Sequence, residues 1–189
     1  MLFHYPSAYA DAAYVRSVVK IELGARSDTD PHTTPQIQPY LGEVFPTILT
    51  DSVFTVRTLA PERTFWEKAM LLHEETFRDA NSAPKARLAR HYYDLWCLIR
   101  KGIGEKAMAD RVLFERVAAH RKVFFRKSKK AQDTLCQGAL RIVPLTEQTP
   151  GWKQDYQSMR EDMFFGEVPT FEEILRLVGD FEKLFNQKN

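Results

Sequence analysis

Residues 61–79, PERTFWEKAMLLHEETFRD, mark the point where the sequence changes from short strand-like segments to helices. Pro61 opens the segment, and a helix tolerates proline at its first position because the amide it lacks has no intrahelical partner there. Large side chains then recur at offsets of four, seven and eleven residues, which is the spacing of one helix face: Trp66, Met70, His73 and Phe77. The segment therefore predicts a helix that packs one face against a core.

The residues on either side of this helix differ in character. Upstream, LFHYPS (2–7), AYVRSVVKIELGAR (13–26) and SVFTVRTL (52–59) have the apolar and alternating patterns of strands. The intervening segment 27–39 is rich in proline, threonine and aspartate and predicts a loop. Downstream, helices are expected over 85–102 with Gly102 as its C-cap, 105–125, 152–164, and from about Thr170, where TFEE offers a capping box. The order predicts an α+β fold, with strands first and a helical bundle after them.

Composition sets limits on the class of protein. The chain has 189 residues, of which 44% are hydrophobic and 12% aromatic, so it can bury a real core. Its net charge of +2 does not by itself predict a nucleic-acid partner. Cys97 and Cys136 are far apart and form no C-x-x-C pair, which fits a reducing cytosol and predicts a cytoplasmic protein. No apolar run approaches the roughly 18 residues of a membrane span, and no signal peptide is visible.

The segment VVKIELGAR (18–26) carries two opposite charges on one face of the expected strand. Lys20 and Glu22 are two residues apart, so their side chains point the same way. One interpretation is an ion pair on a solvent-facing edge. The other is a carboxylate on a strand that binds metal or acts as a base.

Two helices carry further charged residues. In the helix over 61–79, Lys68 either forms an ordinary helix-surface pair or meets a phosphate, and His73 is expected to be a packed, hydrogen-bonded residue. In the helix over 85–102, offsets of three, four and seven place four side chains in one arc: Arg87, Arg90, His91 and Asp94. Asp94 would orient His91, hold Arg90, or form only a weak surface pair.

Residues 116–130 are basic and contain no carboxylate. Phe124 and Phe125 lie among the cations, and such a combination can neutralise RNA phosphates and stack on exposed bases. A solvated helix end is the alternative. If the segment binds RNA, four cations are the expected contacts: Arg121, Lys122, Arg126 and Lys127.

Asp28 and Asp30 stand in an Asp-x-Asp arrangement that divalent ions favour. They lie in the proline- and threonine-rich loop and no glycine turn precedes them. We therefore interpret them as turn residues.

The segments VKIELGAR, PERTFWEKAMLLHEE and RHYYDLW, in this order, resemble the AbiEii/AbiGii toxin family of nucleotidyltransferases. The resemblance runs from LFHYPS to about Ile99. It implies a polymerase-β-like nucleotidyltransferase with a helical C-terminal domain. Residues 1–58 would then be the remnant of the nucleotidyltransferase sheet and residues 59–189 the helical domain. Such toxins move a nucleotide from a nucleoside triphosphate to an RNA acceptor, tRNA ends in some members, and act in abortive infection beside a separate antitoxin.

The resemblance also implies roles for particular residues. Magnesium neutralises the triphosphate in such reactions, and carboxylates hold it. Glu22 matches the third carboxylate, as a catalytic and metal-binding residue, and Asp94 matches a catalytic aspartate. The expected nucleotide-binding residues are Lys68, Lys20, Arg90 and His91. His91 stands where many relatives have the first aspartate of this motif, so the resemblance does not assign it that aspartate's role.

The family's glycine-rich turn and its S-x-D-x-D pair are expected before this region, and the sequence contains neither. The chain therefore resembles the C-terminal part of such an enzyme, with a possible missing N-terminal half, and we expect it to be inactive alone. The alternative is a non-enzymatic helical module that binds RNA or protein.

Overall fold

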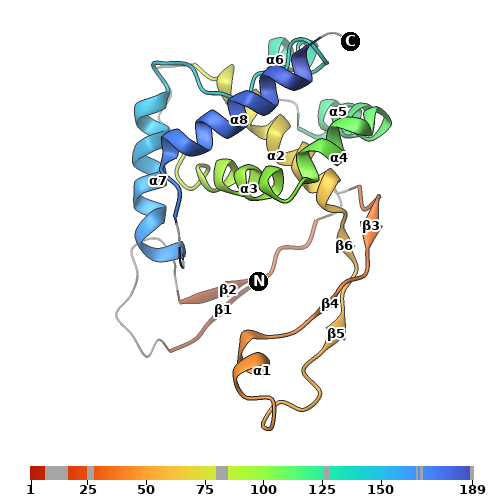
Figure 1. Cartoon of the computed structure of the whole chain (residues 1–189), viewed down its shortest axis with the longest axis vertical. Coiled ribbons are helices and arrows are strands. Elements are labelled where there is room, and N and C mark those ends of the chain that lie inside the picture. Colours follow the sequence, from red (N-terminus) through yellow and green to blue (C-terminus); the bar gives the residue numbers. More distant parts are fainter. Residues whose placement is uncertain are drawn as a thin grey trace.

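The computed structural model describes residues 1–6, 17–24, 28–79, 85–125, 128–164, 166 and 168–187. All helices but one short one at the end of a β-ribbon form one body, and this ribbon and a β-hairpin lie below it (Figure 1). Short strands come first in the chain and helices follow, so the predicted α+β class is confirmed. The division into residues 1–58 and 59–189 stays a prediction.

Within the described residues, the strands are shorter than the sequence suggested and form three antiparallel pairs. They are β1 (Leu2–His4) with β2 (Val18–Lys20), β3 (His32–Thr33) with β6 (Thr58–Leu59), and β4 (Gln36–Ile37) with β5 (Phe54–Thr55). LFHYPS thus holds β1, whereas the long strand expected over 13–26 is limited to β2 within the described residues. The strand expected over 52–59 is divided into β5 and β6.

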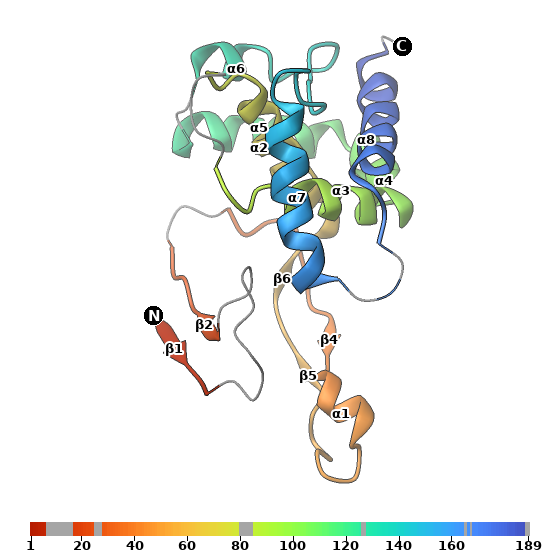
Figure 2. The same ribbon diagram turned by 90° about the vertical axis from the view of Figure 1, so that its left-hand side faces the viewer.

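One register unites the last two pairs into a single ribbon over residues 32–59. His32 lies opposite Leu59 and Gln36 opposite Thr55, and Val56 donates its backbone N–H to the carbonyl of Pro35 between them. The ribbon ends in a short helix, α1 (Tyr40–Val44), that the sequence did not predict (Figure 2).

The helix expected at Pro61 is α2 (Pro61–Thr76), and it packs against α3, α4 and α5. Its predicted face is inside the protein: Trp66, Met70 and His73 are fully buried and Phe77 is partly buried. The Trp66 ring meets Phe114 at 4.8 Å and Phe185 at 5.1 Å between centroids, and its Nε1 donates to the carbonyl of Ala107 at 3.1 Å. These contacts join α2 to three later helices.

The next helices are α3 (Arg90–Arg100), α4 (Ile103–Ala109) and α5 (Arg111–Phe124). Gly102 has φ of +72° at the end of α3, so the predicted glycine C-cap is confirmed. The single helix expected over 105–125 is wrong, because the backbone turns at Asp110. The Asp110 side chain accepts the N–H of Leu113 and so begins α5 as an N-cap.

The C-terminal helices are α6 (Lys129–Asp133), α7 (Thr149–Met163) and α8 (Phe171–Asn186). The capping box at Thr170 and Glu173 is present as predicted, whereas α6 was not expected. Among the helices of the described residues, none combines the length and apolar composition that crossing a bilayer requires.

Candidate functional site

A lysine and an aspartate meet where α2 packs against α3. Lys68 Nζ lies 2.6 Å from Asp94 Oδ2, and the two side chains are 23% and 37% exposed. The amphipathic pattern of α2 places Lys68 at the edge of the buried face, where its ammonium reaches α3 and still contacts solvent. The contact therefore combines a fixed geometry with access for an anion.

His91 lies one turn before Asp94 on the same side of α3. Its Nδ1 is 3.9 Å from Asp94 Oδ2, and this buried atom has no hydrogen-bond partner among the described residues. Burial lowers the pKa of His91 to about 4, and the positive charges of Lys68 and Arg90 act in the same direction. His91 is therefore neutral at pH 7, in a setting where cations outnumber carboxylates.

Glu22 follows β2 and is exposed. Its carboxylate forms an exposed ion pair with Lys20, a contact that both interpretations of this pair allow. The hydrogen bond and charge of Lys20 lower the pKa of Glu22, and Arg90 contributes in the same direction. Glu22 thus lies within the electrostatic reach of α3, and its catalytic role stays a prediction.

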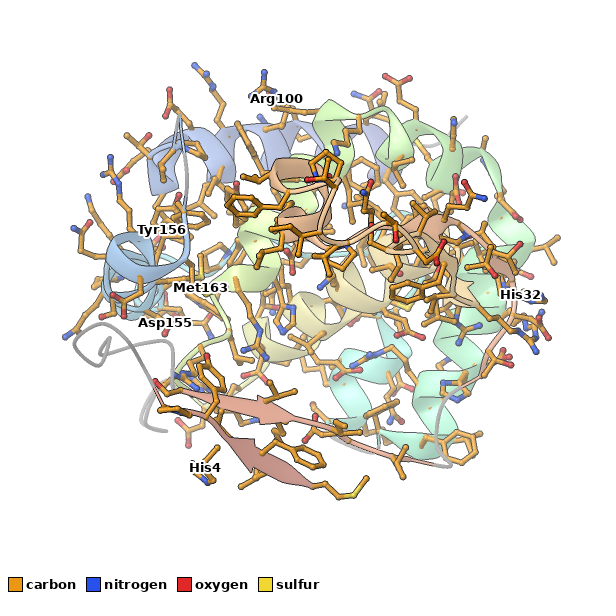
Figure 3. The ribbon with its side chains drawn as sticks, turned by 90° about the horizontal axis from the view of Figure 1, so that it is seen from below. His4, His32, Arg100, Asp155, Tyr156 and Met163 are labelled. Atoms are coloured by element: carbon orange, nitrogen blue, oxygen red, sulfur yellow. The ribbon has the colours of Figure 1, made fainter. Side chains whose placement is uncertain are left out.

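Arg87 does not lie on the arc predicted for it. It precedes α3, with φ of +68°, and its backbone N–H donates to Asp155 Oδ1 at 2.7 Å. Asp155 Oδ2 accepts from Ala89 N–H at 2.7 Å, so this α7 residue caps the start of α3. Figure 3 shows Asp155 on α7, on the opposite side of the body from His32. No signal near α3 in the sequence indicates this cap, because Asp155 lies 66 and 68 residues away.

Arg121 was expected to be an exposed RNA contact, and the structure corrects this prediction because the side chain is buried. The residue is 5% exposed, and its Nε and Nη2 both donate to the Glu74 carboxylate at 2.8 Å. Its position four residues after Val117 and three after Ala118 puts it on the apolar face of α5, a signal the sequence contained. Lys122 is exposed as expected. Arg126 and Lys127 lie outside the described residues.

His73 is a packed, hydrogen-bonded residue, as predicted. Its Nδ1 accepts the N–H of Arg141 at 3.0 Å, so Nε2 carries the proton and donates to the Ala131 carbonyl at 2.9 Å. Burial lowers its pKa, which keeps the ring neutral. With both nitrogens used inside the core, His73 contributes to stability.

Asp28 and Asp30 form a turn, as interpreted. Asp28 Oδ1 accepts the N–H of Asp30 at 3.2 Å, and Oδ2 accepts from Arg63 at 2.9 Å and from Arg116 at 2.8 Å. Burial raises the pKa of Asp28, but these donors outweigh burial and bring the pKa to about 2. Both arginines were unforeseen partners, and Arg63 is wholly buried.

The described residues contain no group of three or more histidine, cysteine, aspartate or glutamate side chains that is arranged to hold a metal ion. Glu22 is a single carboxylate paired with a lysine. Magnesium in such sites is usually bound by one or two carboxylates together with waters and substrate phosphates, so the magnesium expected from the family stays a prediction.

Comparison with known proteins identifies the class. The family model described as "Nucleotidyl transferase AbiEii toxin, Type IV TA system" matches residues 1–177, which places the chain among the nucleotidyltransferase toxins of toxin–antitoxin systems. The protein belongs to the AbiEii family, and the match extends well beyond the segment ending near Ile99 that suggested it. The family implies a cognate antitoxin. No curated protein matches the chain, and no solved structure does.

Proposed function

We propose that this chain supplies the phosphate-binding part of a nucleotidyltransferase site, in a toxin that transfers a nucleotide from a nucleoside triphosphate to an RNA acceptor such as tRNA. The observation that supports this most is the contact between Lys68 and Asp94 across α2 and α3, beside Arg90 and a neutral His91. Phosphoryl transfer depends mainly on positioning and on positive charge at the phosphates, and this group of residues offers both.

Each residue has a distinct part in this proposal. Lys68 meets the triphosphate as a compact positive charge, and Asp94 keeps its ammonium in place before the nucleotide arrives. Arg90 adds a second, exposed cation on α3, and Lys20 adds a third next to Glu22. Glu22 is the carboxylate that would assist the attacking hydroxyl. When bound, magnesium would neutralise charge on the triphosphate.

The β1–β2 hairpin would be the remnant of a polymerase-β-like sheet, to which Glu22 is attached. The 189 residues contain no S-x-D-x-D motif after a glycine-rich turn. We therefore propose that the purified chain binds a nucleoside triphosphate but transfers no nucleotide alone.

Binding of ATP to the purified chain by isothermal titration calorimetry tests the site. Lys68→Met should weaken binding by at least about tenfold, because one phosphate contact is lost. The matched control is Lys153→Met. Lys153 Nζ lies 2.5 Å from Glu172, an ion pair similar in length to that of Lys68 but on another surface. Equal affinities for the two variants would refute the assignment of the site.

A transfer assay tests inactivity separately. The chain is incubated with radiolabelled nucleoside triphosphates, magnesium and total tRNA, and we expect no incorporation. Incorporation that Glu22→Ala abolishes would overturn the proposed inactivity and assign catalysis to this chain.

A second candidate function, binding of RNA by a non-enzymatic module, rests on the surface around the end of α5. Lys122, Lys129 and Lys130 are exposed there, and so are the rings of Phe124 and Phe125. Cations beside open aromatic rings suit unpaired nucleotides. Arg121 offers no exposed charge to this surface, because it is paired with buried Glu74 and its guanidinium lies 4.8 Å from the centroid of the Phe125 ring.

Binding of single-stranded RNA as a function of salt tests the second function. Neutralising Lys122 should reduce the salt slope by about one, whereas neutralising exposed Lys183 on α8 should leave it unchanged. If the chain does not bind single-stranded RNA even at low salt, this second function is excluded.

A further inference from the structure

The end of the ribbon exposes an unusually dense group of apolar side chains. Within residues 37–54, which we name the tip, nine large apolar residues are exposed: Ile37, Tyr40, Leu41, Val44, Phe45, Ile48, Leu49, Val53 and Phe54. Scaled by side-chain size, with about 150–250 Å² for an aromatic residue, the exposed fractions correspond to roughly 900 Å² of surface. A monomer rarely leaves a patch of this size open unless something binds it.

The tip has a built shape that turns these side chains outward. Gly42 is buried against Ser52, and a Cβ at position 42 would lie only 2.6 Å from Ser52 Oγ. Gln38 donates to Ser52 Oγ at 3.1 Å, which ties the two sides of the tip together. The backbone N–H groups of Ile48 and Leu49 both donate to the carbonyl of Phe45. Gly42 and Ser52 are thus packed against each other, and the apolar side chains of the tip are left exposed to bind a partner.

Charge narrows the choice of partner. Residues 36–55 contain two carboxylates, Glu43 and Asp51, and no lysine, arginine or histidine. Nucleic acids and anionic lipid surfaces are bound through cations, so neither suits the tip. The tip also stands away from the helical body in two perpendicular views (Figures 1 and 2), which leaves it open to another molecule.

We propose that the tips of two copies of this chain pack together as a symmetric dimer. A standard protein interface buries about 800 Å² on each partner, and the tip exposes a similar apolar area, roughly 900 Å² summed over its nine residues. A two-fold contact places the same apolar patch against itself and needs no complementary charge pattern, which the tip lacks. A two-stranded ribbon is also marginally stable in water, so each copy stabilises the ribbon of the other.

Sedimentation velocity over a range of concentrations tests the proposal. Interfaces of this area have dissociation constants of about 1 µM or below, so the wild-type chain should be dimeric at tens of micromolar. Ile48→Glu should weaken dimerisation at least about a hundredfold, because the symmetry buries two unpaired carboxylates. Tyr40→Glu, in α1 of the tip, should do the same.

The matched control is Val112→Glu. Val112 on α5 is 76% exposed and Ile48 is 75% exposed, so both changes add one charge at an equally open apolar position. The control should dimerise like the wild type, and circular dichroism should show all three variants folded. A wild-type chain that remains monomeric at about 100 µM overturns the proposal and assigns the tip to a different protein. If Val112→Glu weakens dimerisation as much as Ile48→Glu does, the dimer interface does not lie at the tip.

Discussion

Replacing Arg121 with methionine tests whether this residue holds the fold together. Both nitrogens that face Glu74 donate at 2.8 Å, and Nη1 donates to the Glu67 carbonyl at 3.4 Å. Methionine keeps much of the apolar stem but removes the charge. The Glu74 carboxylate, itself only 5% exposed, then loses both charged hydrogen bonds from Arg121. Breaking a buried ion pair in this way costs about 3–5 kcal/mol of unfolding free energy.

Urea and thermal unfolding followed by circular dichroism measure this loss. For a chain of this size, 1 kcal/mol shifts the melting temperature by about 2–4 °C, so the variant should melt roughly 6–20 °C lower. The double variant Arg121→Met/Glu74→Leu should recover most of the loss, because an apolar pair of similar volume leaves no buried charge.

Lys153→Met is the control, because it breaks an exposed ion pair whose partners are both 62% exposed. It should cost less than about 1 kcal/mol. Two results would refute the reasoning: equal costs for Arg121→Met and Lys153→Met, or an Arg121→Met chain of unchanged stability that has lost RNA binding. The second result would return Arg121 to the RNA-binding surface.

Three further changes test the residues around the site. The folded pKa of His91 is about 4 and its ordinary value is 6.5, so the unfolded chain takes up the proton first as pH falls. Stability is thus full above pH 6.5 and decreases towards pH 4, and His91→Gln should remove up to about 3 kcal/mol of that dependence in urea titrations. Asp155→Ala removes the acceptor of two N–H groups before α3 and should cost about 1–2 kcal/mol, with faster amide exchange at Ala89. Tyr92→Phe loses the hydroxyl that donates to the Ile142 carbonyl at 2.8 Å, so chemical denaturation should show a loss of about 1–3 kcal/mol.

The sequence predicted those parts of the fold that depend on neighbouring residues. Three local signals are present in the structure: the spacing of the buried face of α2, the glycine after α3, and the capping box at Thr170 and Glu173. Asp110 was also a local signal, because an aspartate before an apolar helical run is a good N-cap, and it was overlooked. Strand lengths were wrong because a two-stranded ribbon offers no wide sheet to extend them.

The site was predicted only in part, because its geometry depends on how helices pack. Lys68 and Asp94 were both named, but their 2.6 Å contact is set by the way α2 lies against α3. The cap that Asp155 places on α3 connects residues far apart in sequence, which no periodic pattern reports. For Arg121, a local signal was misinterpreted. The residue was assigned to an exposed surface because its neighbours in sequence are basic, although its spacing from Val117 and Ala118 places it on the apolar face of α5.

The cap that Asp155 on α7 provides also determines when α3 can reach its native, capped state during synthesis. A ribosome makes the chain from its N-terminus, so Asp155 is added 66 residues after Ala89, the backbone it caps. Until α7 leaves the exit tunnel, the helix that carries His91 and Asp94 has an uncapped start and lacks its docking partner. Nascent chains stopped before α7 should therefore be cleaved by protease near α3, whereas released full-length chains resist. In a toxin built in this way, the helix that carries Asp94 is capped only after a segment 66 residues further along the chain has been made.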